Sequence, residues 1–230
     1  MARTDVIVLG AGIVGTSAAL HLAKRGLAVA LVDRRGPGEE TSYGNAGIIE
    51  GNTLFAHAFP SGFETLLRIA LNRAPEAHYH LSHLPKIATW LLAYRANTRG
   101  EASFAFAEAM RPLYSRALGE HEALLTEAGA LRYLRKDGWL KLYREDVSFA
   151  ASARERDYAS QLGLEHCVLD GEQAHALEPS LKPVFRHAVH WIGAASISNP
   201  LAVTRSYAAQ FAKHGGVTLK GDARTLHRSG

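Results

Sequence analysis

The sequence has a single cysteine, Cys167, among its 230 residues. No disulfide can therefore form within the chain, which excludes a disulfide-stabilised scaffold. No apolar stretch approaches the roughly 18 residues that a membrane-spanning helix needs. At the start, Arg3 and Asp5 lead directly into a short apolar run, which is unlike a secretory signal. We therefore expect a cytoplasmic protein, with peripheral contact at the cytoplasmic face of a membrane as an open alternative.

Local excess of one charge is also lacking. Lys and Arg number 26 and Asp and Glu number 22, which gives a net charge of +4 with His neutral, and no run of five like charges occurs. Nucleic-acid-binding proteins concentrate basic residues on one face, so we expect no nucleic-acid partner. Hydrophobic residues make up 47% and charged residues 21%, the composition of an ordinary globular protein with one large domain or two small ones.

The first 33 residues have the pattern of a strand–helix–strand unit. Residues 5–9 are apolar and rich in β-branched residues, which predicts a buried parallel strand. Residues 14–24 have helical periodicity, and Gly26 is placed to end that helix. Residues 27–32 predict a second buried strand, which ends at Asp33.

The rest of the chain predicts a mixture of helices and strands after a glycine-rich loop at 36–53. Helices are expected within residues 61–128 and at 148–162, 171–177 and 199–214. Strands are expected at 138–144, 165–169 and 186–192, with a last strand or strand pair at 216–227. Asn199 and Pro200 form the start signal of the last helix. The fold class is therefore α/β, with no internal repeat.

A G-x-G-x-x-G motif joins the first strand to the first helix. Gly10 allows the tight turn, Gly12 allows a pyrophosphate to approach the backbone, and Gly15 lets the helix pack closely on the sheet. Asp33 follows Gly15 by 18 positions, at the end of the second strand, where its carboxylate can accept both ribose hydroxyls. This context predicts dinucleotide binding and disfavours a 2′-phosphate. The motif alone leaves FAD and NAD as alternatives.

A second segment is more specific. Residues 40–47 read E-T-S-Y-G-N-A-G. Together with residues 5–34, this segment resembles the N-terminal part of the FAD-dependent D-amino-acid dehydrogenases, within the D-amino-acid oxidase superfamily, which have a T-S-x-x-N-A-G loop against the flavin and its ribityl–pyrophosphate arm. The resemblance implies FAD as the cofactor. It implies these cofactor-binding residues: Gly10, Gly12, Ile13, Val14, Gly15, Asp33, Arg34, Ser42, Asn45, Ala46 and Gly47.

The resemblance also implies a fold and a reaction. The fold is a Rossmann-like FAD-binding domain with an inserted α+β substrate domain. The implied domains are a first FAD-binding segment in 1–60, a helical insert and part of the substrate domain in 61–195, and a return to the FAD-binding domain in 196–230. Family members are considerably longer, so the sequence corresponds to their N-terminal portion. Residues 221–224 read G-D-A-R, where family members often place a valine that meets the adenine.

The implied reaction is amino-acid catabolism by oxidation. A D-amino acid or related amine transfers a hydride to the flavin, and the imino acid hydrolyses to an oxo acid and ammonia. The electron acceptor would be a membrane quinone. We name no catalytic residue, because a neutral amine requires no general base and because the family's carboxylate-binding residues mostly lie beyond the matching part.

Two other functions are open alternatives. One is an NAD-dependent dehydrogenase, although no Tyr-x-x-x-Lys pair occurs in the sequence. The other is a non-catalytic fragment of such a flavoprotein, whose exposed apolar surface would make the isolated chain associate.

Two further segments were considered as sites. His78, His80 and His83 form a cluster without an acidic or cysteine partner at ligand spacing, so we expect no metal site. Residues 87–94 are apolar, with Lys86 and Arg95 at their ends. They predict either a buried helix, which we prefer, or a segment that dips into a membrane surface.

Overall fold

The structure is a computed structural model that describes residues 4–51, 55, 59–60, 62–74, 77–182 and 184–225. The chain divides into two compact units, one formed by residues 1–52 and 116–230 and the other by residues 53–115. Helix α4 (Gly100–Glu127) contributes residues to both. It contains Pro112, which has no N–H to donate to the preceding turn. One helix therefore carries the chain from the second unit into the first.

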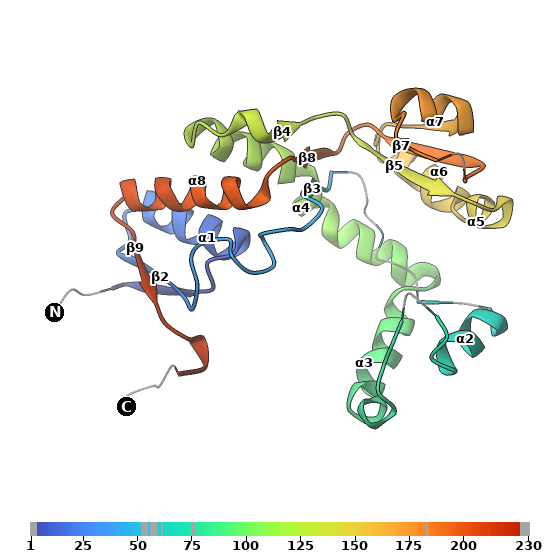
Figure 1. Cartoon of the computed structure of the whole chain (residues 1–230), viewed down its shortest axis with the longest axis horizontal. Coiled ribbons are helices and arrows are strands. Elements are labelled where there is room, and N and C mark those ends of the chain that lie inside the picture. Colours follow the sequence, from blue (N-terminus) through green and yellow to red (C-terminus); the bar gives the residue numbers. More distant parts are fainter. Residues whose placement is uncertain are drawn as a thin grey trace. The chain divides into compact units, whose positions relative to one another are not determined.

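The first unit contains a three-stranded parallel sheet in the order β1-β2-β9. β1 (Val6–Leu9) pairs with β2 (Val29–Asp33), which pairs in turn with β9 (Val217–Lys220). α1 (Ile13–Lys24) and α8 (Pro200–Lys213) pack together and cover one face of this sheet (Figure 1). Right-handed crossovers that advance in one direction place both helices on the same face. The predicted strand–helix–strand unit is confirmed, with the second strand beginning at Val29.

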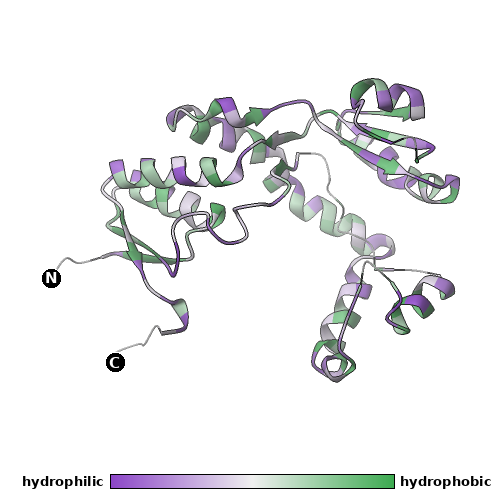
Figure 2. Ribbon diagram, in the orientation of Figure 1, coloured by the Kyte–Doolittle hydropathy of each residue, from purple (hydrophilic) through white to green (hydrophobic). Residues whose placement is uncertain are grey.

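The core of this unit lies between the sheet and its helices. Leu31 of β2, Leu20 of α1 and Tyr207 and Phe211 of α8 are fully buried there, together with Leu125 at the end of α4. Helices α1, α4 and α8 show hydrophobic and hydrophilic residues in alternation along their length (Figure 2). That alternation is typical of helices that bury one side only.

The other face of the sheet is apolar and exposed. The strand register aligns Ile7 with Ala30 and Val217 in one row, and Leu9 with Val32 and Leu219 in the next. Four of these side chains are about half exposed: Ile7 at 53%, Leu9 at 44%, Val217 at 52% and Leu219 at 49%. Parallel sheets are normally covered on both faces.

Two helix ends follow their sequence signals. Gly26 has a φ of 84° and donates its N–H to the carbonyl of Ala23 at 2.9 Å, which ends α1. Asn199 accepts the N–H of Ala202 at 3.0 Å and Pro200 is the first residue of α8, so the predicted start is confirmed.

A short antiparallel sheet in the order β3-β8-β4 was missed. It consists of β3 (Ile48–Ile49), β8 (Ala195–Ile197) and β4 (Leu134–Arg135), the last of which follows the 3₁₀ turn η2 (Leu131–Tyr133). Strands of two or three residues are too short for an alternating pattern to be recognised in the sequence. The loop predicted over 36–53 therefore contains one strand.

A third sheet, in the order β5-β7-β6, is antiparallel, and its three strands were predicted but not their pairing. Its strands are β5 (Trp139–Tyr143), β7 (His187–Trp191) and β6 (His166–Asp170). Helices α5 (Asp146–Ala151), α6 (Ala153–Gln161) and α7 (Gly171–Leu177) accompany it. The single helix predicted over 148–162 was wrong. The chain turns at Ser152, whose N–H and hydroxyl both donate to the carbonyl of Phe149.

The strand predicted over 216–227 is shorter than expected. β9 ends at Lys220, and a 3₁₀ turn, η3 (Ala223–Thr225), follows it. Asp222 begins this turn, since its carbonyl accepts the N–H of Thr225 at 2.9 Å. The last positions of the predicted strand, 226 and 227, lie outside the described residues.

The second unit contains α2 (Phe63–Ala70), η1 (Leu81–His83), α3 (Leu84–Asn97) and the first part of α4. Our expectation that residues 87–94 form a buried helix was wrong in part. They are helical, but α3 has no buried residue, and Trp90 and Leu92 are 63% and 69% exposed. Within the described part of the chain, no helix is both long enough and apolar enough to span a membrane.

Candidate functional site

Each glycine of the loop between β1 and α1 is there for a different reason: backbone conformation at Gly10, lack of space at Gly15 and a tight contact at Gly12. Gly10 has a φ of 101°, which favours glycine, and donates its N–H to the carbonyl of Val32 at 2.8 Å. A Cβ on Gly15 would lie 1.9 Å from the carbonyl oxygen of Gly10. A Cβ on Gly12 would lie 3.2 Å from the hydroxyl of Ser42. The loop therefore presents bare backbone at the start of α1.

The first turn of α1 is a set of backbone donors. The first four N–H groups of an α-helix have no partner within the helix. In α1 these belong to Gly12, Ile13, Val14 and Gly15, and no acidic residue lies in the first turn. Ile13 donates to the hydroxyl of Ser42 at 2.9 Å. The other donors and the positive end of the helix dipole make this end suitable for an anion.

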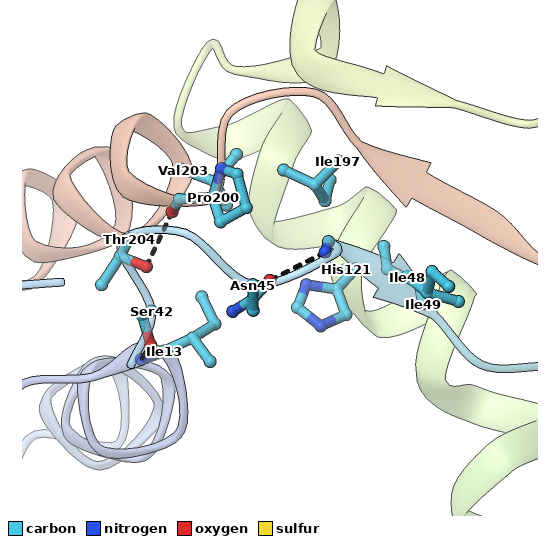
Figure 3. Close-up of a pocket in the computed structure, with 11 residues that line it drawn as sticks. Ile13, Ser42, Asn45, Ile48, Ile49, His121, Ile197, Pro200, Val203 and Thr204 are labelled. Atoms are coloured by element: carbon cyan, nitrogen blue, oxygen red, sulfur yellow. Dashed lines mark hydrogen bonds between the residues drawn. The ribbon is translucent and has the colours of Figure 1, made fainter. Parts of the chain in front are cut away.

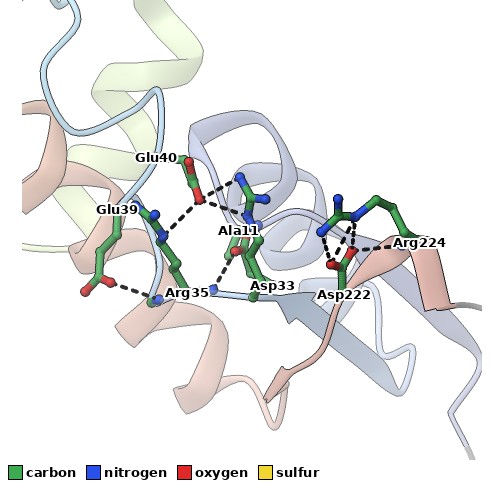
Figure 4. Close-up of polar contacts among 9 residues, drawn as sticks. Ala11, Asp33, Arg35, Glu39, Glu40, Asp222 and Arg224 are labelled. Carbon is green, nitrogen blue, oxygen red and sulfur yellow. Dashed lines mark hydrogen bonds and ion pairs between the residues drawn. The ribbon is translucent and has the colours of Figure 1, made fainter.

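Asp33 lies at the carboxyl end of β2 and fixes the glycine-rich loop. One carboxylate oxygen accepts the N–H of Ala11 at 2.7 Å, and the other accepts the N–H of Arg35 at 2.9 Å (Figure 4). Each carboxylate oxygen has about two acceptor positions. One position on each oxygen is therefore free for a further donor, which is what two ribose hydroxyls need.

Charged side chains surround this end of the sheet. Glu40 accepts from Arg34 at 2.9 Å and from Arg35 at 3.1 Å. Glu39 accepts the N–H of Gly36 at 3.1 Å and pairs with Arg205 of α8 at 2.9 Å. The Gly36 hydrogen bond, and then Arg205, hold the pKa of Glu39 below its usual value. The Glu39–Arg205 pair attaches the segment after β2 to α8, and the other pairs lie within that segment.

The T-S-x-x-N-A-G segment is fixed at both ends. Ser42 is buried and caps α1, as described above. At the other end Gly47 has a φ of 65°, and a Cβ there would lie 2.3 Å from the carbonyl of Ile197 in β8. Asn45 accepts the N–H of Gly47 at 2.8 Å. Ala46 is exposed between them.

A cavity lies along this segment, between α1, α4 and α8 (Figure 3). Its lining residues are Ile13, Ser42, Asn45, Gly47, Ile48, Ile49, His121, Ile197, Pro200, Val203 and Thr204. His121 of α4 was not recognised in the sequence. Its Nδ1 lies 3.1 Å from the hydroxyl of the buried Tyr207. Burial lowers the pKa of His121 and raises that of Tyr207, so both side chains are neutral near pH 7.

A second cavity lies where β2 and β9 end. It is lined by Val32, Asp33, Arg34, Glu40, Thr41, Gly221, Asp222, Ala223 and Arg224. Gly221 donates its N–H to the carbonyl of Asp33 at 2.9 Å, which holds the two strand ends together. Asp222 and Arg224, which follow β9, form an ion pair that also lines this cavity (Figure 4).

Both cavities adjoin the start of α1 and the segment that follows β2. Ile13 and Ser42 line the first cavity, and Asp33, Glu40 and Thr41 line the second. Bare glycine backbone, free N–H groups and a carboxylate match the pyrophosphate and ribose of a dinucleotide. In the described part of the chain, no group of three His, Cys, Asp or Glu residues is placed to hold a metal.

The family profile of the FAD-dependent oxidoreductases matches residues 5–230. The chain belongs to this family. The cofactor of this family is FAD, as the glycine motif and the T-S-x-x-N-A-G segment predicted. The family match and the solved structures below also confirm the predicted fold class. The prediction that individual residues contact FAD stays a prediction.

Curated relatives in this family are similar over most of this chain. A D-amino acid dehydrogenase of Paramagnetospirillum magneticum is 35% identical over 184 residues, and one of Chromohalobacter salexigens is 31% identical over 185 residues. Each alignment covers 78% of this chain and 43% of the relative. The chain thus spans less than half the length of these relatives.

Solved structures share the fold. Glycine oxidase from Geobacillus kaustophilus has a TM-score of 0.62 at 20% identity, over 96% of this chain and 47% of its own. L-amino acid deaminase from Proteus vulgaris has a TM-score of 0.64 at 16% identity, over 99% of this chain and 47% of its own. At these identities the likeness concerns the fold alone.

Proposed function

We propose that this chain binds FAD in an extended conformation along the carboxyl edge of its parallel sheet. The pyrophosphate would lie against the N–H groups of Val14 and Gly15, the adenosine ribose would donate to Asp33, and the flavin arm would follow Ser42 and residues 45–47. The supporting observation is the 2.9 Å hydrogen bond from Ile13 to Ser42, because it holds the family-specific segment at the helix end that accepts anions.

Several groups of the chain would orient this cofactor. The Ser42 hydroxyl, while accepting from Ile13, has its own proton to donate to a phosphate oxygen. Arg34, adjacent to Asp33, lines the second cavity, in which the adenosine would lie. Asn45 uses its oxygen on Gly47 and donates its amide only at 3.5 Å to the carbonyl of Thr41, so this amide is the more available donor toward the flavin side.

We further propose that the protein oxidises D-amino acids or related amines in amino-acid catabolism. Bound FAD would supply the acceptor for a hydride from the α-carbon, and the imino acid, formed with loss of a proton from nitrogen, would hydrolyse to an oxo acid and ammonia. The residues of this chain would hold the cofactor in one orientation, which is a large part of the catalytic task in such a transfer. The D-amino acid dehydrogenase relatives support this substrate class.

Anaerobic titration tests this activity. The FAD-loaded protein should lose its absorption near about 450 nm when D-amino acids are added, and the matching L-amino acids should leave it unchanged. Bleaching by L-amino acids alone would overturn the proposed substrate class. Glycine and a secondary amine test the related substrates. Glycine has no D or L form because its α-carbon is not chiral, and the secondary amine has a second carbon substituent on nitrogen.

A second candidate function is nucleotide binding without turnover. It is favoured because the alignment covers only 43% of the length of each of the two relatives compared above. In this case the 230 residues bind FAD or ADP but show no bleaching with any amino acid. Loading and bleaching are separate readouts, so one preparation distinguishes the two candidates.

We also propose that residues 61–195 contribute to substrate binding, whereas 1–60 and 196–230 bind the cofactor. For the electron acceptor we propose a membrane quinone, reached from the cytoplasmic face. Exposed apolar residues of the second unit support membrane contact: Phe63, Leu67 and Leu71 recur at four-residue spacing along α2 and just beyond it, and Trp90 and Leu92 lie on α3.

Sedimentation with anionic phospholipid vesicles tests this contact. The wild type should sediment with the vesicles, and the double variant Phe63→Ser, Trp90→Ser should remain in the supernatant. Val147→Ser removes an equally exposed apolar residue from the first unit and is the matched control. Equal sedimentation of the wild type and the double variant would exclude membrane contact through α2 and α3.

A further inference from the structure

A third cavity lies on the antiparallel sheet, between its edge strand β5 and the end of α7. Its described lining residues are Asp137, Gly138, Trp139, Leu140, Leu142, Leu177, Glu178, Leu181 and His190. None of them lines either of the two cavities described above. The cavity has a volume of about 550 Å³, which is within the range of small-molecule sites. It is therefore large enough for a ligand of its own.

One part of this cavity is apolar. Leu140 and Leu142 lie on the same face of the sheet, because side chains two residues apart in a strand point to the same side. Leu181 packs into the small core that α7 forms on that face. Leu142 and Leu177 are 38% and 55% exposed, so the chain itself covers this apolar surface only in part. An aliphatic ligand would bury more of it.

The loop that carries Asp137 is held against β7. His190 of β7 places its Nε2 2.8 Å from the carbonyl oxygen of Asp137. Next in the chain, Gly138 has a φ of 69°, and a Cβ there would lie 2.2 Å from the carbonyl oxygen of Trp191. These two contacts fix the position of Asp137 before any ligand binds, which lowers the cost of binding.

Three side chains of the cavity have a free acceptor. A carbonyl oxygen only accepts, so the Nε2 of His190 carries the proton, and the Nδ1 of the neutral ring has a free lone pair. Among the described residues, none forms a hydrogen bond or ion pair with the carboxylate of Asp137. Glu178 accepts the N–H of Ser180 at 3.2 Å with one carboxylate oxygen and keeps the other.

No basic side chain neutralises these acceptors. There is no lysine or arginine among the described lining residues, although the chain as a whole has a net charge of +4. The acceptors do not converge on one point, since no group of three His, Cys, Asp or Glu residues in the described chain is placed to hold a metal. Separate acceptors beside an apolar surface match a ligand whose ammonium groups are joined by methylenes.

We propose that this third cavity binds an aliphatic diamine, with one ammonium group at the carboxylate of Asp137 and the other at that of Glu178. The methylene chain lies on Leu140 and Leu142, and the Nδ1 of His190 accepts a further N–H. The site shares no residue with the proposed FAD site, so it does not depend on the binding of FAD.

Calorimetric titration of the 230-residue chain at low ionic strength tests this site. The probes are 1,4-diaminobutane, with two charges, 1-aminobutane, with one, and the uncharged 1,4-butanediol. The diamine should bind about fivefold more tightly than the monoamine, the size of one partly exposed ion pair, and the diol should not bind. Asp137→Asn and Glu178→Gln should each bring the diamine and the monoamine within about twofold of one another.

Glu172→Gln is the matched control. Glu172 is an exposed glutamate of α7 that does not line the cavity, so its replacement should leave the preference for the diamine unchanged. Melting curves of the variants confirm that each is folded. A diamine that binds no more tightly than the monoamine, or a preference that survives both cavity substitutions, overturns the proposal. Loss of the preference in Glu172→Gln also overturns it, because the net charge of the chain would then explain the binding.

Discussion

The hydroxyl of Ser42 accepts the N–H of Ile13 at 2.9 Å, across 29 positions of sequence. Ile13 is the first residue of α1, and Ser42 belongs to the T-S-x-x-N-A-G segment. The bond joins two motifs that the sequence shows separately. It places a side-chain hydroxyl among the backbone donors at the start of a helix, where an anion binds best.

Ser42→Ala should weaken both the fold and the binding of FAD. The change leaves the N–H of Ile13 without its partner, a loss of about 1 kcal/mol of unfolding free energy, as for other helix caps. Urea unfolding and a fluorescence titration with FAD measure the two effects. Ser206→Ala is the control, because its hydroxyl donates to the carbonyl of Ala202 within α8. An unchanged FAD affinity in Ser42→Ala would exclude a role of this hydroxyl in the site.

Gly15→Ala should be strongly destabilising. Its Cβ would lie 1.9 Å from the carbonyl oxygen of Gly10, so backbone must shift, at a cost of about 2–4 kcal/mol. Gly119→Ala, inside α4, has no atom within 4 Å of the new Cβ other than those of the adjoining helix backbone, and should instead stabilise the chain by about 0.5–1 kcal/mol. Urea unfolding of both variants measures the contrast. Similar effects from the two substitutions would contradict the close approach of α1 to β1.

His121 should make stability depend on pH. Burial lowers its pKa below 6.5 in the folded protein, so the unfolded chain binds more protons as the pH falls below that value. The free energy of unfolding should therefore decrease as the pH is lowered from about 6.5 to about 5. His121→Gln should reduce this slope, which chemical unfolding at several pH values will show. His175→Gln, an exposed histidine on α7, is the control. An equal slope in wild type and His121→Gln would be inconsistent with a buried neutral imidazole.

The exposed face of the parallel sheet should cause the isolated 230-residue chain to associate. Replacing Ile7 and Leu219, which are 53% and 49% exposed, with lysine should lower the mean mass in sedimentation velocity. Val147→Lys changes an exposed apolar residue outside this sheet and should leave the mass unchanged. A monomeric wild type would show that this face does not drive association.

The sequence predicted the long elements and the glycine loop because each has a local cause. Gly10 and Gly26 adopt positive φ values, and Asn199 caps α8, as these residue types do in many proteins. The glycine motif likewise pointed to residues 10–15 and Asp33, and the resemblance pointed to Ser42; their contact with FAD stays a prediction. It did not reveal that Asp33 also holds the loop through Ala11, since hydrogen bonds across 22 positions have no sequence signature.

Other features depended on tertiary structure. β3, β4 and β8 are too short for a periodic signal. The turn at Ser152 separates α5 from α6, although the helical periodicity of the sequence continues through it. His121 lies three residues after Leu118 and four before Leu125, on the buried side of α4. Its helical spacing from these two leucines was the one sign in the sequence that this polar residue would be buried. The Asp222–Arg224 pair formed where the strand pattern predicted continuing extended chain.

The most direct measurement is an absorption spectrum of the purified 230-residue chain after incubation with FAD and desalting. Our account predicts retained bands near about 375 and 450 nm, the bands of oxidised flavin. It further predicts that these bands decrease in Ser42→Ala and persist in Ser206→Ala. A colourless wild-type protein after desalting would contradict the claim that these residues bind the cofactor.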